Sequence, residues 1–513
     1  MIWLRKFADD YLKFTWLVSD RKNDRKVQEG SSNTYFFAGT NAFLLIFISL
    51  MVFSFFKHII WRGGFDWDEL YLVRAASMGN FVAQLIPEPT PPLQAVLFKF
   101  LVLIGIPPSE IFMRMPNLII ATSLIALLWK IAHKFRLQLI LLFSLILTST
   151  IPHTLIYVAQ ARPYFIGYFT ILFFSFVWYF DRKSKLNTSK RTLAASLLAS
   201  TLHIYGGIVC AIVFSLESLI DRKLNKKGLI SAIGPYSFWL LISSAGNKDK
   251  VSRVLWMKVP GVDDFKLHVF EQLLGGVLPS LIIAVGILLL FANFGSKSFE
   301  IRGPGLTLLA SFLGTIIFAY FFSYIIPIWY PRNFLFCLPL LIFSASLGYY
   351  NVFSALFKKS EFLAGAVLLV VIISMASTIS NVLFDKTNSM SPGKYRDTSE
   401  NALNTQVLED RMIIIGWEDT EVYKFYFSTL ALGEDFNLQF KSRFDQDLSV
   451  EEQVFFYLLH VVQIYVCVAK YVNELTCLKP TYLRDHMCEQ GIGCYVKGYT
   501  QEHIAGTLVH LTT

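Results

Sequence analysis

Three carboxylates stand close together directly after the first long apolar stretch of the chain. Asp66, Asp68 and Glu69 lie in the segment FDWDEL, followed by an amphipathic run from Leu70 to Leu85. Ionisable groups are costly to hold near lipid, so in a membrane protein they are functional candidates. A carboxylate here can take a proton from an attacking hydroxyl. The alternative is a solvated acidic loop in which Asp68 or Glu69 caps the following helix.

Basic and aromatic residues that suit an anionic substrate occur in three further short segments. These are QARPY with Arg162 and Tyr164, HIYGG with His203, and IWYPRN with Arg332. An arginine can hold a phosphate through paired hydrogen bonds. The alternatives are that Arg162 and Arg332 snorkel at helix starts and that His203 is a packing histidine.

A metal site is a weaker hypothesis for the acidic segment. Asp66, Trp67 and Asp68 formally match a DxD metal motif. A three-residue match is weak, and no soluble nucleotide-binding domain surrounds it. We therefore expect neither a metal ion nor another cofactor.

The composition places these residues in a membrane protein. Of 513 residues, 54% are hydrophobic and 16% are charged, against about 25% charged in an ordinary soluble domain. The apolar residues form long charge-free runs, each close to the roughly 20 residues that cross a bilayer. The net charge is +9, and the Lys and Arg residues lie mostly in short loops between these runs. This distribution is the positive-inside pattern of membrane proteins rather than a sign of nucleic-acid binding.

The predicted fold is an all-α polytopic membrane domain over residues 41–380. Residues 1–40 are expected in the cytoplasm, without a cleavable signal peptide, and residues 57–115 form the first outer loop. Within that loop, residues 92–106 are expected to lie in the outer interface, with a spanning helix as the alternative. The eleven predicted spans are residues 41–56, 116–132, 137–151, 163–180, 192–203, 208–219, 229–245, 279–294, 306–326, 333–353 and 362–380.

One predicted outer loop strains the positive-inside rule. Gly246 to Gln272 carries five basic residues, among them Lys258 and Lys266. Acidic residues count little in this rule and do not cancel the discrepancy. Either the loop binds an anion or one of the predicted spans is wrong.

Residues 381–513 have a different composition, with polar and charged residues common. We predict a small extracytoplasmic α/β domain there, with strands at Met412–Ile415 and Val461–Val468 and a helix at Glu421–Leu430. In an oxidising compartment two disulfides are expected, with their pairing open. The cysteines concerned are Cys467, Cys477, Cys488 and Cys494, whereas Cys210 and Cys337 lie in apolar runs and are expected to be inert.

The predicted topology gathers the polar candidates on the outer face. The span interiors contain almost no ionisable residues, whereas an ion-coupled transporter usually buries carboxylates near the midplane. The pattern therefore favours an enzyme that acts on a substrate at the membrane surface.

Several segments in this order resemble the GT-C glycosyltransferases. They are WDELYLVRAA, PPLQAVLFKFL, SEIFMRMPNLI, QARPYFIGYFTILF, HIYGG and PRNFLFCLPLL. The resemblance covers roughly residues 41–380 and is nearest to the protein O-mannosyltransferases (glycosyltransferase family 39) and the lipid A aminoarabinose transferase. The chain departs from many relatives in having PTPPL without a preceding histidine, and its cysteine-bearing C-terminal region matches no known pattern.

The resemblance implies transfer of a sugar, with inversion, from a polyprenyl-phosphate carrier at the outer face of the bacterial inner membrane. It implies Asp68 as the base and Glu69 as a positioning group. Arg162 and Arg332 would hold the donor phosphate, together with Lys266 or Lys258 of the basic outer loop. His203 would line the donor site, together with Tyr164.

Rival functions remain open at this point. A lipid-linked sugar flippase would move the substrate without covalent change, and an oligosaccharide ligase or polymerase would transfer a preassembled glycan. The expected partners are the lipid-linked donor, membrane lipids and a lipid, glycan or protein acceptor, and not nucleic acid. The sequence names neither the sugar nor the acceptor.

Overall fold

The computed structural model describes the helical region and four strands. The described residues are 32–62, 65, 67–77, 79–85, 91–135, 137–184, 188–245, 260–292, 298–325, 328–359, 411–415, 439–442, 466–470 and 474–478. The chain divides into two compact units, residues 1–46 and residues 47–513. All contacts below lie within the second unit.

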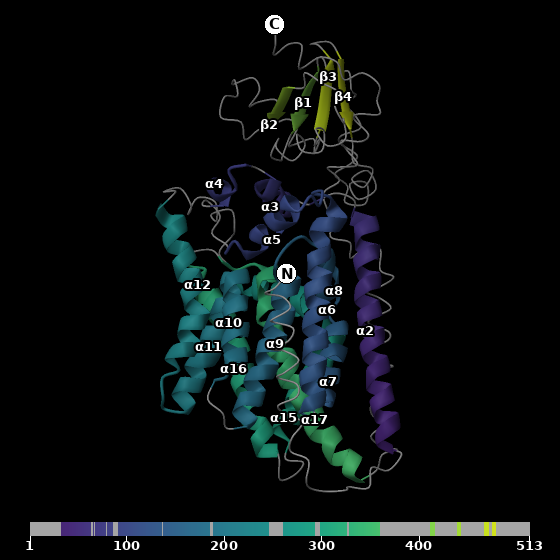
Figure 1. Ribbon diagram of the computed structural model, residues 1–513, viewed down its shortest axis with the longest axis vertical. Coiled ribbons are helices and arrows are strands. Elements are labelled where there is room, and N and C mark those ends of the chain that lie inside the picture. Colours follow the sequence, from purple (N-terminus) through teal and green to yellow (C-terminus); the bar gives the residue numbers. More distant parts are fainter. Residues whose placement is uncertain are drawn as a thin grey trace. The chain divides into compact units, whose positions relative to one another are not determined.

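Helices make up almost all of the described chain between residues 32 and 359 (Figure 1). In chain order they are α2 (Ser32–Arg62), α3 (Trp67–Ser77), α4 (Phe81–Leu85), α5 (Leu93–Leu103), α6 (Glu110–Lys134), α7 (Gln138–Ser149), α8 (Pro152–Ile156), η1 (Tyr157–Ala159), α9 (Tyr164–Lys183), α10 (Lys190–Leu202), α11 (Ile204–Ile220), α12 (Lys226–Ala245), α14 (Val262–Phe265), η2 (Lys266–Leu273), α15 (Val277–Phe291), α16 (Ser298–Phe322), η3 (Pro331–Phe336) and α17 (Leu338–Lys359).

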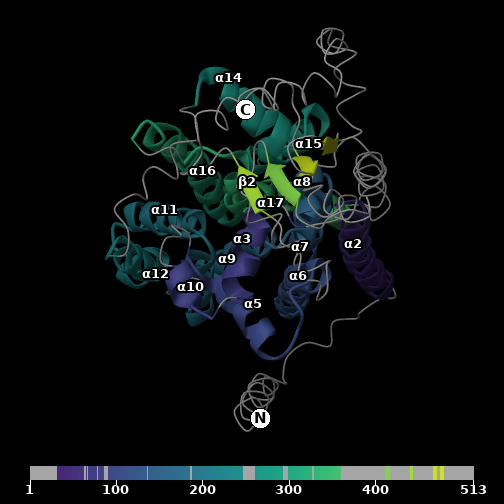
Figure 2. The ribbon, with the colours of Figure 1, turned by 90° about the horizontal axis from the view of Figure 1, so that it is seen from above.

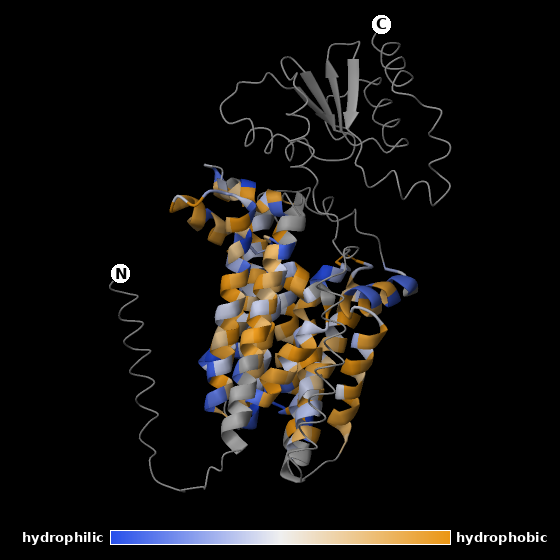
Figure 3. Ribbon diagram, turned by 90° about the vertical axis from the view of Figure 1, so that its right-hand side faces the viewer, coloured by the Kyte–Doolittle hydropathy of each residue, from blue (hydrophilic) through white to orange (hydrophobic). Residues whose placement is uncertain are grey.

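Three described helices are long and apolar enough to cross a membrane: Glu110–Lys134, Tyr164–Lys183 and Ile301–Phe322. The bent pair Asp263–Leu273 and Val277–Phe291 makes a fourth if it forms one span. Hydrophobic residues run along the long helices, and hydrophilic residues gather mainly near their ends (Figure 3). The chain is a helical membrane protein, and the number of eleven spans stays a prediction because several apolar helices are shorter.

The helices pack in groups that Figure 2 shows end-on. Helices α10, α11 and α12 contact one another, and α17 packs against α15, α16, α7 and α9. Helix α9 is buried along nearly its whole length. Large apolar side chains such as Leu288 on α15 and Phe321 on α16 are 68% and 66% exposed, as suits helix faces that meet lipid rather than water.

The short helices α3, α4 and α5 share an apolar core with Met113 of α6 and Ala161. Leu70, Val73 and Ala76 of α3 pack with Ala95 and Phe98 of α5. Helix α5 has 11 residues, which at about 1.5 Å per residue is roughly 17 Å. This length is short of the ~30 Å hydrocarbon core. Its placement in the interface stays a prediction.

The described part of the predicted outer loop from Gly246 to Gln272 contains a helical stretch, residues 262–273. The segment turns by 87° into α15. Gly275 and Gly276 make this turn with φ of 77° and 101°, a backbone conformation that costs glycine little. An apolar face made by Val269 and Leu273, four residues apart and both buried, explains why this charged segment forms a helix.

Four described strands form a sheet with the order β2-β1-β3-β4. They are β1 (Arg411–Ile415), β2 (Gln439–Ser442), β3 (Val466–Lys470) and β4 (Glu474–Leu478). Strand β1 pairs parallel with β2 and antiparallel with β3, and Cys467 of β3 lies opposite Cys477 of β4. The predicted helix at Glu421–Leu430 and the other two C-terminal cysteines lie outside the described residues, so the α/β domain and its disulfides stay predictions.

Helices α15 and α17 approach each other through two glycines, which generates a stability prediction. A Cβ at Gly348 would lie 2.8 Å from the backbone nitrogen of Leu290 and collide with the carbonyl of Gly286. We expect Gly348→Ala to lower the free energy of unfolding by about 1–3 kcal/mol, the usual cost of overpacking. Thermal unfolding in detergent measures this. Gly303→Ala is the matched control, since nothing lies within 4 Å of its added Cβ; equal melting temperatures for the two variants would contradict the close approach.

Candidate functional site

The acidic segment is anchored by an ion pair that is closed to solvent. The Glu69 carboxylate of α3 accepts hydrogen bonds from Arg114 of α6, at 2.9 Å from Nε and 2.7 Å from Nη2. Both side chains are 0% exposed. Glu69 also accepts a hydrogen bond from the backbone N–H of Ala161. One carboxylate therefore ties α3 to α6 and to the QARPY segment.

A second residue of α6 holds the same segment one turn further along. Asn117 donates to the carbonyl of Arg162 at 3.1 Å and also to the carbonyl of Gln160. Asn117 follows Arg114 by three residues, so both side chains lie on one face of α6. Both are fully buried. This face fixes the backbone on either side of Ala161 and so positions Arg162.

His203 joins two helices at the site. It ends α10 and begins α11, where its Nδ1 accepts the backbone N–H of Tyr205 at 3.2 Å. Its ring stacks on Phe336 of η3 at 4.8 Å and lies 5.8 Å from the ring of Tyr164. Burial lowers the pKa of His203, and the nearby charges of Arg162 and Arg332 lower it further. The imidazole is therefore neutral at physiological pH.

The glycines of HIYGG have a packing reason. A Cβ at Gly206 would collide with the carbonyl of Ala199 on α10, and a Cβ at Gly207 would lie 2.7 Å from the carbonyl of Ala232 on α12. Only glycine allows the three backbones this approach. The conspicuous pair of glycines thus serves the helix packing that carries His203, rather than a ligand.

Arg332 lies among aromatic rings contributed by two elements. Its guanidinium carbon is 4.5 Å from the ring centre of Tyr330 and 5.5 Å from that of Tyr164, within cation–π range. Tyr164 follows Arg162 by two residues, and both arginines lie close enough to His203 to lower its pKa. The fold thus brings Arg162, Tyr164, His203 and Arg332 together.

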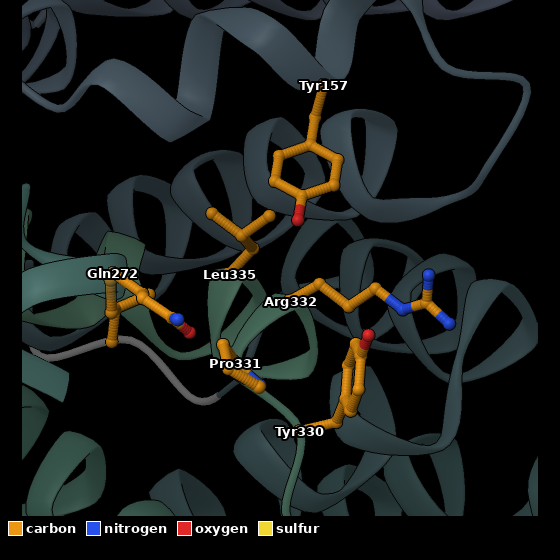
Figure 4. Close-up of a pocket in the computed structure, with 7 residues that line it drawn as sticks. Tyr157, Gln272, Tyr330, Pro331, Arg332 and Leu335 are labelled. Atoms are coloured by element: carbon orange, nitrogen blue, oxygen red, sulfur yellow. The ribbon is translucent and has the colours of Figure 1, made fainter. Parts of the chain in front are cut away.

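A pocket of about 200 Å³ opens beside this cluster (Figure 4). Its lining comes from η1, η2 and the stretch from Tyr330 to Leu335, most of which is η3. The lining residues are Tyr157, Gln272, Leu273, Tyr330, Pro331, Arg332 and Leu335. Tyr157 also packs edge-to-face on Tyr164 at 5.6 Å, so the pocket and the arginine cluster share a wall.

The remaining predicted site residues have different placements. Asp68 is the second residue of α3, and its side chain lies outside the described residues. Lys266 is exposed on η2 and is not part of the pocket lining. Cys210 and Cys337, predicted to be inert, are free and buried.

Sequence reasoning missed four residues of the site. Arg114 and Asn117 stand in the segment SEIFMRMPNLI without a predicted role, and Tyr157 and Gln272 have no predicted role either. A usable signal existed for the first two, because a charged and an amide side chain three residues apart near the start of an apolar helix need a buried partner. No pattern in the sequence marks Tyr157 or Gln272.

Comparisons with known proteins add little to these observations. No protein-family model matches the chain, and neither does any curated protein. Among solved structures, the crystal structure of ArnT from Cupriavidus metallidurans bound to undecaprenyl phosphate is similar, with 11% sequence identity and a TM-score of 0.47 over 82% of this chain and 88% of that chain. A likeness of this size decides neither the fold nor the function.

The buried ion pair generates a prediction about stability. Glu69→Ala leaves the Arg114 charge buried without its carboxylate, so we expect the free energy of unfolding to fall by about 3–5 kcal/mol. The double variant Glu69→Gln, Arg114→Met removes both charges of the ion pair. We expect it to lower the free energy of unfolding by less than Glu69→Ala does. Denaturant unfolding in detergent provides the values. Additive losses in a Glu69→Ala, Arg114→Ala double-mutant cycle would contradict a direct interaction.

The lowered pKa of His203 predicts a pH dependence of stability. In the unfolded chain His203 binds a proton below about pH 6.5. In the folded chain its lowered pKa keeps it unprotonated to lower pH. The folded state is therefore destabilised relative to the unfolded state as the pH falls below about 6.5. His203→Asn keeps a capping acceptor but cannot titrate. Between pH 7.5 and 5.5 we expect wild type to lose roughly 1 kcal/mol more than this variant. Identical pH profiles of thermal unfolding would refute the buried neutral histidine.

Proposed function

We propose that this chain is a membrane glycosyltransferase that moves a sugar from a polyprenyl-phosphate donor to an acceptor. One observation carries the proposal. Glu69, next to Asp68, binds the backbone of Ala161, next to Arg162. The ion pair to Arg114 holds this contact in place. A carboxylate able to act as base and an arginine able to bind phosphate therefore belong to adjoining backbone segments.

The basic side of this site suits a phosphate. Arg332 reaches Tyr164, which follows Arg162 by two residues, and both guanidinium groups act on His203. Arginine binds phosphate oxygens through paired, charge-assisted hydrogen bonds. His203 is neutral, so it adds no charge of its own and lines the site. Exposed Lys266 is proposed to attract the anionic donor over a longer range.

The proposed step is an in-line displacement at the anomeric carbon of the donor sugar. The acceptor hydroxyl attacks this carbon and its proton passes to the Asp68 carboxylate. The bond from the anomeric carbon to the phosphate oxygen breaks, and its electron pair leaves with the polyprenyl phosphate. Arg162 and Arg332 stabilise the charge that grows on the phosphate. Attack from the opposite side inverts the configuration.

Glu69 acts in this scheme as a positioning residue, because Arg114 and Ala161 engage both of its oxygens. The apolar helices around the site supply a surface for the polyprenyl tail. The acceptor is a lipid, a glycan or a protein. The proposed location is the outer face of a bacterial inner membrane, with the N-terminus in the cytoplasm and the C-terminal domain outside.

The experiment compares cells that express wild type, Asp68→Asn and Asp263→Asn. Mass spectrometry of extracted polyprenyl-phosphate lipids and envelope glycans is the measurement. We expect Asp68→Asn to accumulate one polyprenyl-phosphate sugar while one glycan loses that sugar, with a loss of turnover of at least about 100-fold, as for a missing general base. Asp263→Asn is the matched control, since Asp263 is exposed on α14 and outside the pocket lining.

The rivals give different results. A flippase would move the lipid-linked sugar without forming a new glycosidic bond, so purified protein would release no polyprenyl phosphate from any donor. A ligase would accumulate a lipid-linked oligosaccharide instead of a single sugar. If neither pool changes while folded Asp68→Asn is present in the membrane, Asp68 is not the base.

A further inference from the structure

The pocket beside Arg332 is built differently from a phosphate site. Its polar groups are uncharged apart from Arg332: the hydroxyls of Tyr157 and Tyr330 and the amide of Gln272. In Figure 4 the Tyr157 hydroxyl and the Gln272 amide point into the pocket from different sides, and the Arg332 guanidinium turns away from Gln272 toward Tyr330. Only the aliphatic stem of Arg332 thus faces the space near Gln272.

We propose that this pocket holds the donor's sugar ring, and that Tyr157 and Gln272 select the sugar by its hydroxyl groups. The inference rests on the proposed transfer function and names residues that recognise the sugar. A tyrosine hydroxyl and a carboxamide can each donate and accept a hydrogen bond, as sugar hydroxyls also do. A site built to hydrogen-bond a substrate hydroxyl rejects an analogue that lacks it.

The size of the pocket sets a limit on its occupant. Its volume is about 200 Å³, below the ~300–1,000 Å³ of sites that enclose drug-sized ligands. A space of this size suits one sugar ring. Leu335 and Pro331 form apolar walls, which suit the C–H faces of a ring.

The donor's phosphate and sugar are bonded to each other, so their binding sites must adjoin. Arg332 belongs to both sites. Its stem lines the pocket, and its guanidinium reaches Tyr164 in the arginine cluster. Tyr157 is 4% exposed and packs on Tyr164 at 5.6 Å, so its hydroxyl has a fixed direction. A donor phosphate at the arginines would therefore place its sugar in the pocket.

Gln272 lines the pocket from the end of η2, just before a sharp turn of the chain. The helix η2 ends at Leu273, and Gly275 and Gly276 redirect the chain by 87° into α15. Trp329 of the IWYPRN segment contacts the same helix by donating its indole N–H to His268 at 2.7 Å. These contacts hold the amide against the IWYPRN segment.

The test measures the binding of two kinds of lipid to the full-length chain in detergent by native mass spectrometry. One probe is undecaprenyl phosphate, and the others are undecaprenyl-phosphate monosaccharides that carry a hexose, a pentose or an amino sugar. Wild type is expected to bind at least one sugar-bearing lipid more tightly than undecaprenyl phosphate. Gln272→Leu and Tyr157→Phe are each expected to weaken the binding of that sugar-bearing lipid by roughly five- to tenfold, the effect of one lost hydrogen bond. Both variants are expected to bind undecaprenyl phosphate as tightly as wild type.

Arg332→Ala is expected to weaken the binding of both kinds of lipid. Glu271 is an exposed neighbour on η2, and Glu271→Gln is expected to leave the binding of both unchanged. If wild type binds neither kind of lipid, the proposed function itself fails. If wild type binds undecaprenyl phosphate but no sugar-bearing lipid more tightly, or if both pocket variants bind the sugar-bearing lipid like wild type, the sugar pocket is refuted while the transfer function stands. Tyr157→Phe keeps the ring that packs on Tyr164, so a folding defect in one variant leaves the other decisive.

Discussion

The Glu69–Arg114 ion pair is the contact on which the rest of the site depends. Removing two charges from water costs several kcal/mol for each ion, and only good geometry with further hydrogen bonds offsets this cost. Here two hydrogen bonds from the guanidinium and one from the Ala161 backbone meet a single carboxylate. Such a pair contributes little net stability, but breaking it leaves a buried charge without its partner. It therefore favours the one arrangement in which α3, α6 and the QARPY segment keep these contacts.

The consequences of this pair reach the pocket through a short series of contacts. Ala161 precedes Arg162, and Asn117 fixes the carbonyl of Arg162 at 3.1 Å. Two residues later Tyr164 contacts Arg332, Tyr157 and His203. Tyr164 and Arg332, 168 residues apart in sequence, thus belong to one aromatic cluster. Substitution anywhere in this series is expected to alter ligand binding as well as stability.

The sequence predicted most of the helices and part of the candidate site, but not the contacts between them. Apolar runs predicted most of the helices, and the grouping of Arg162, Tyr164, His203 and Arg332 followed from the outer ends of those runs. The partner of Glu69 was not predictable, because composition and periodicity do not reveal which buried charges meet. The helical stretch at residues 262–273 was not predicted because the segment has no long apolar run, whereas the buried Val269 and Leu273 give it a packed face.

The central claim is that Arg162 and Arg332 bind the donor phosphate beside the segment that contains Asp68 and Glu69. The most direct test is an electron cryomicroscopy structure of the full-length chain in a lipid nanodisc with undecaprenyl phosphate. We predict phosphate density at about 3 Å from the guanidinium groups of Arg162 and Arg332, with the Glu69–Arg114 pair intact. Phosphate density elsewhere on the chain, with those two arginines making no contact to it, would contradict the account.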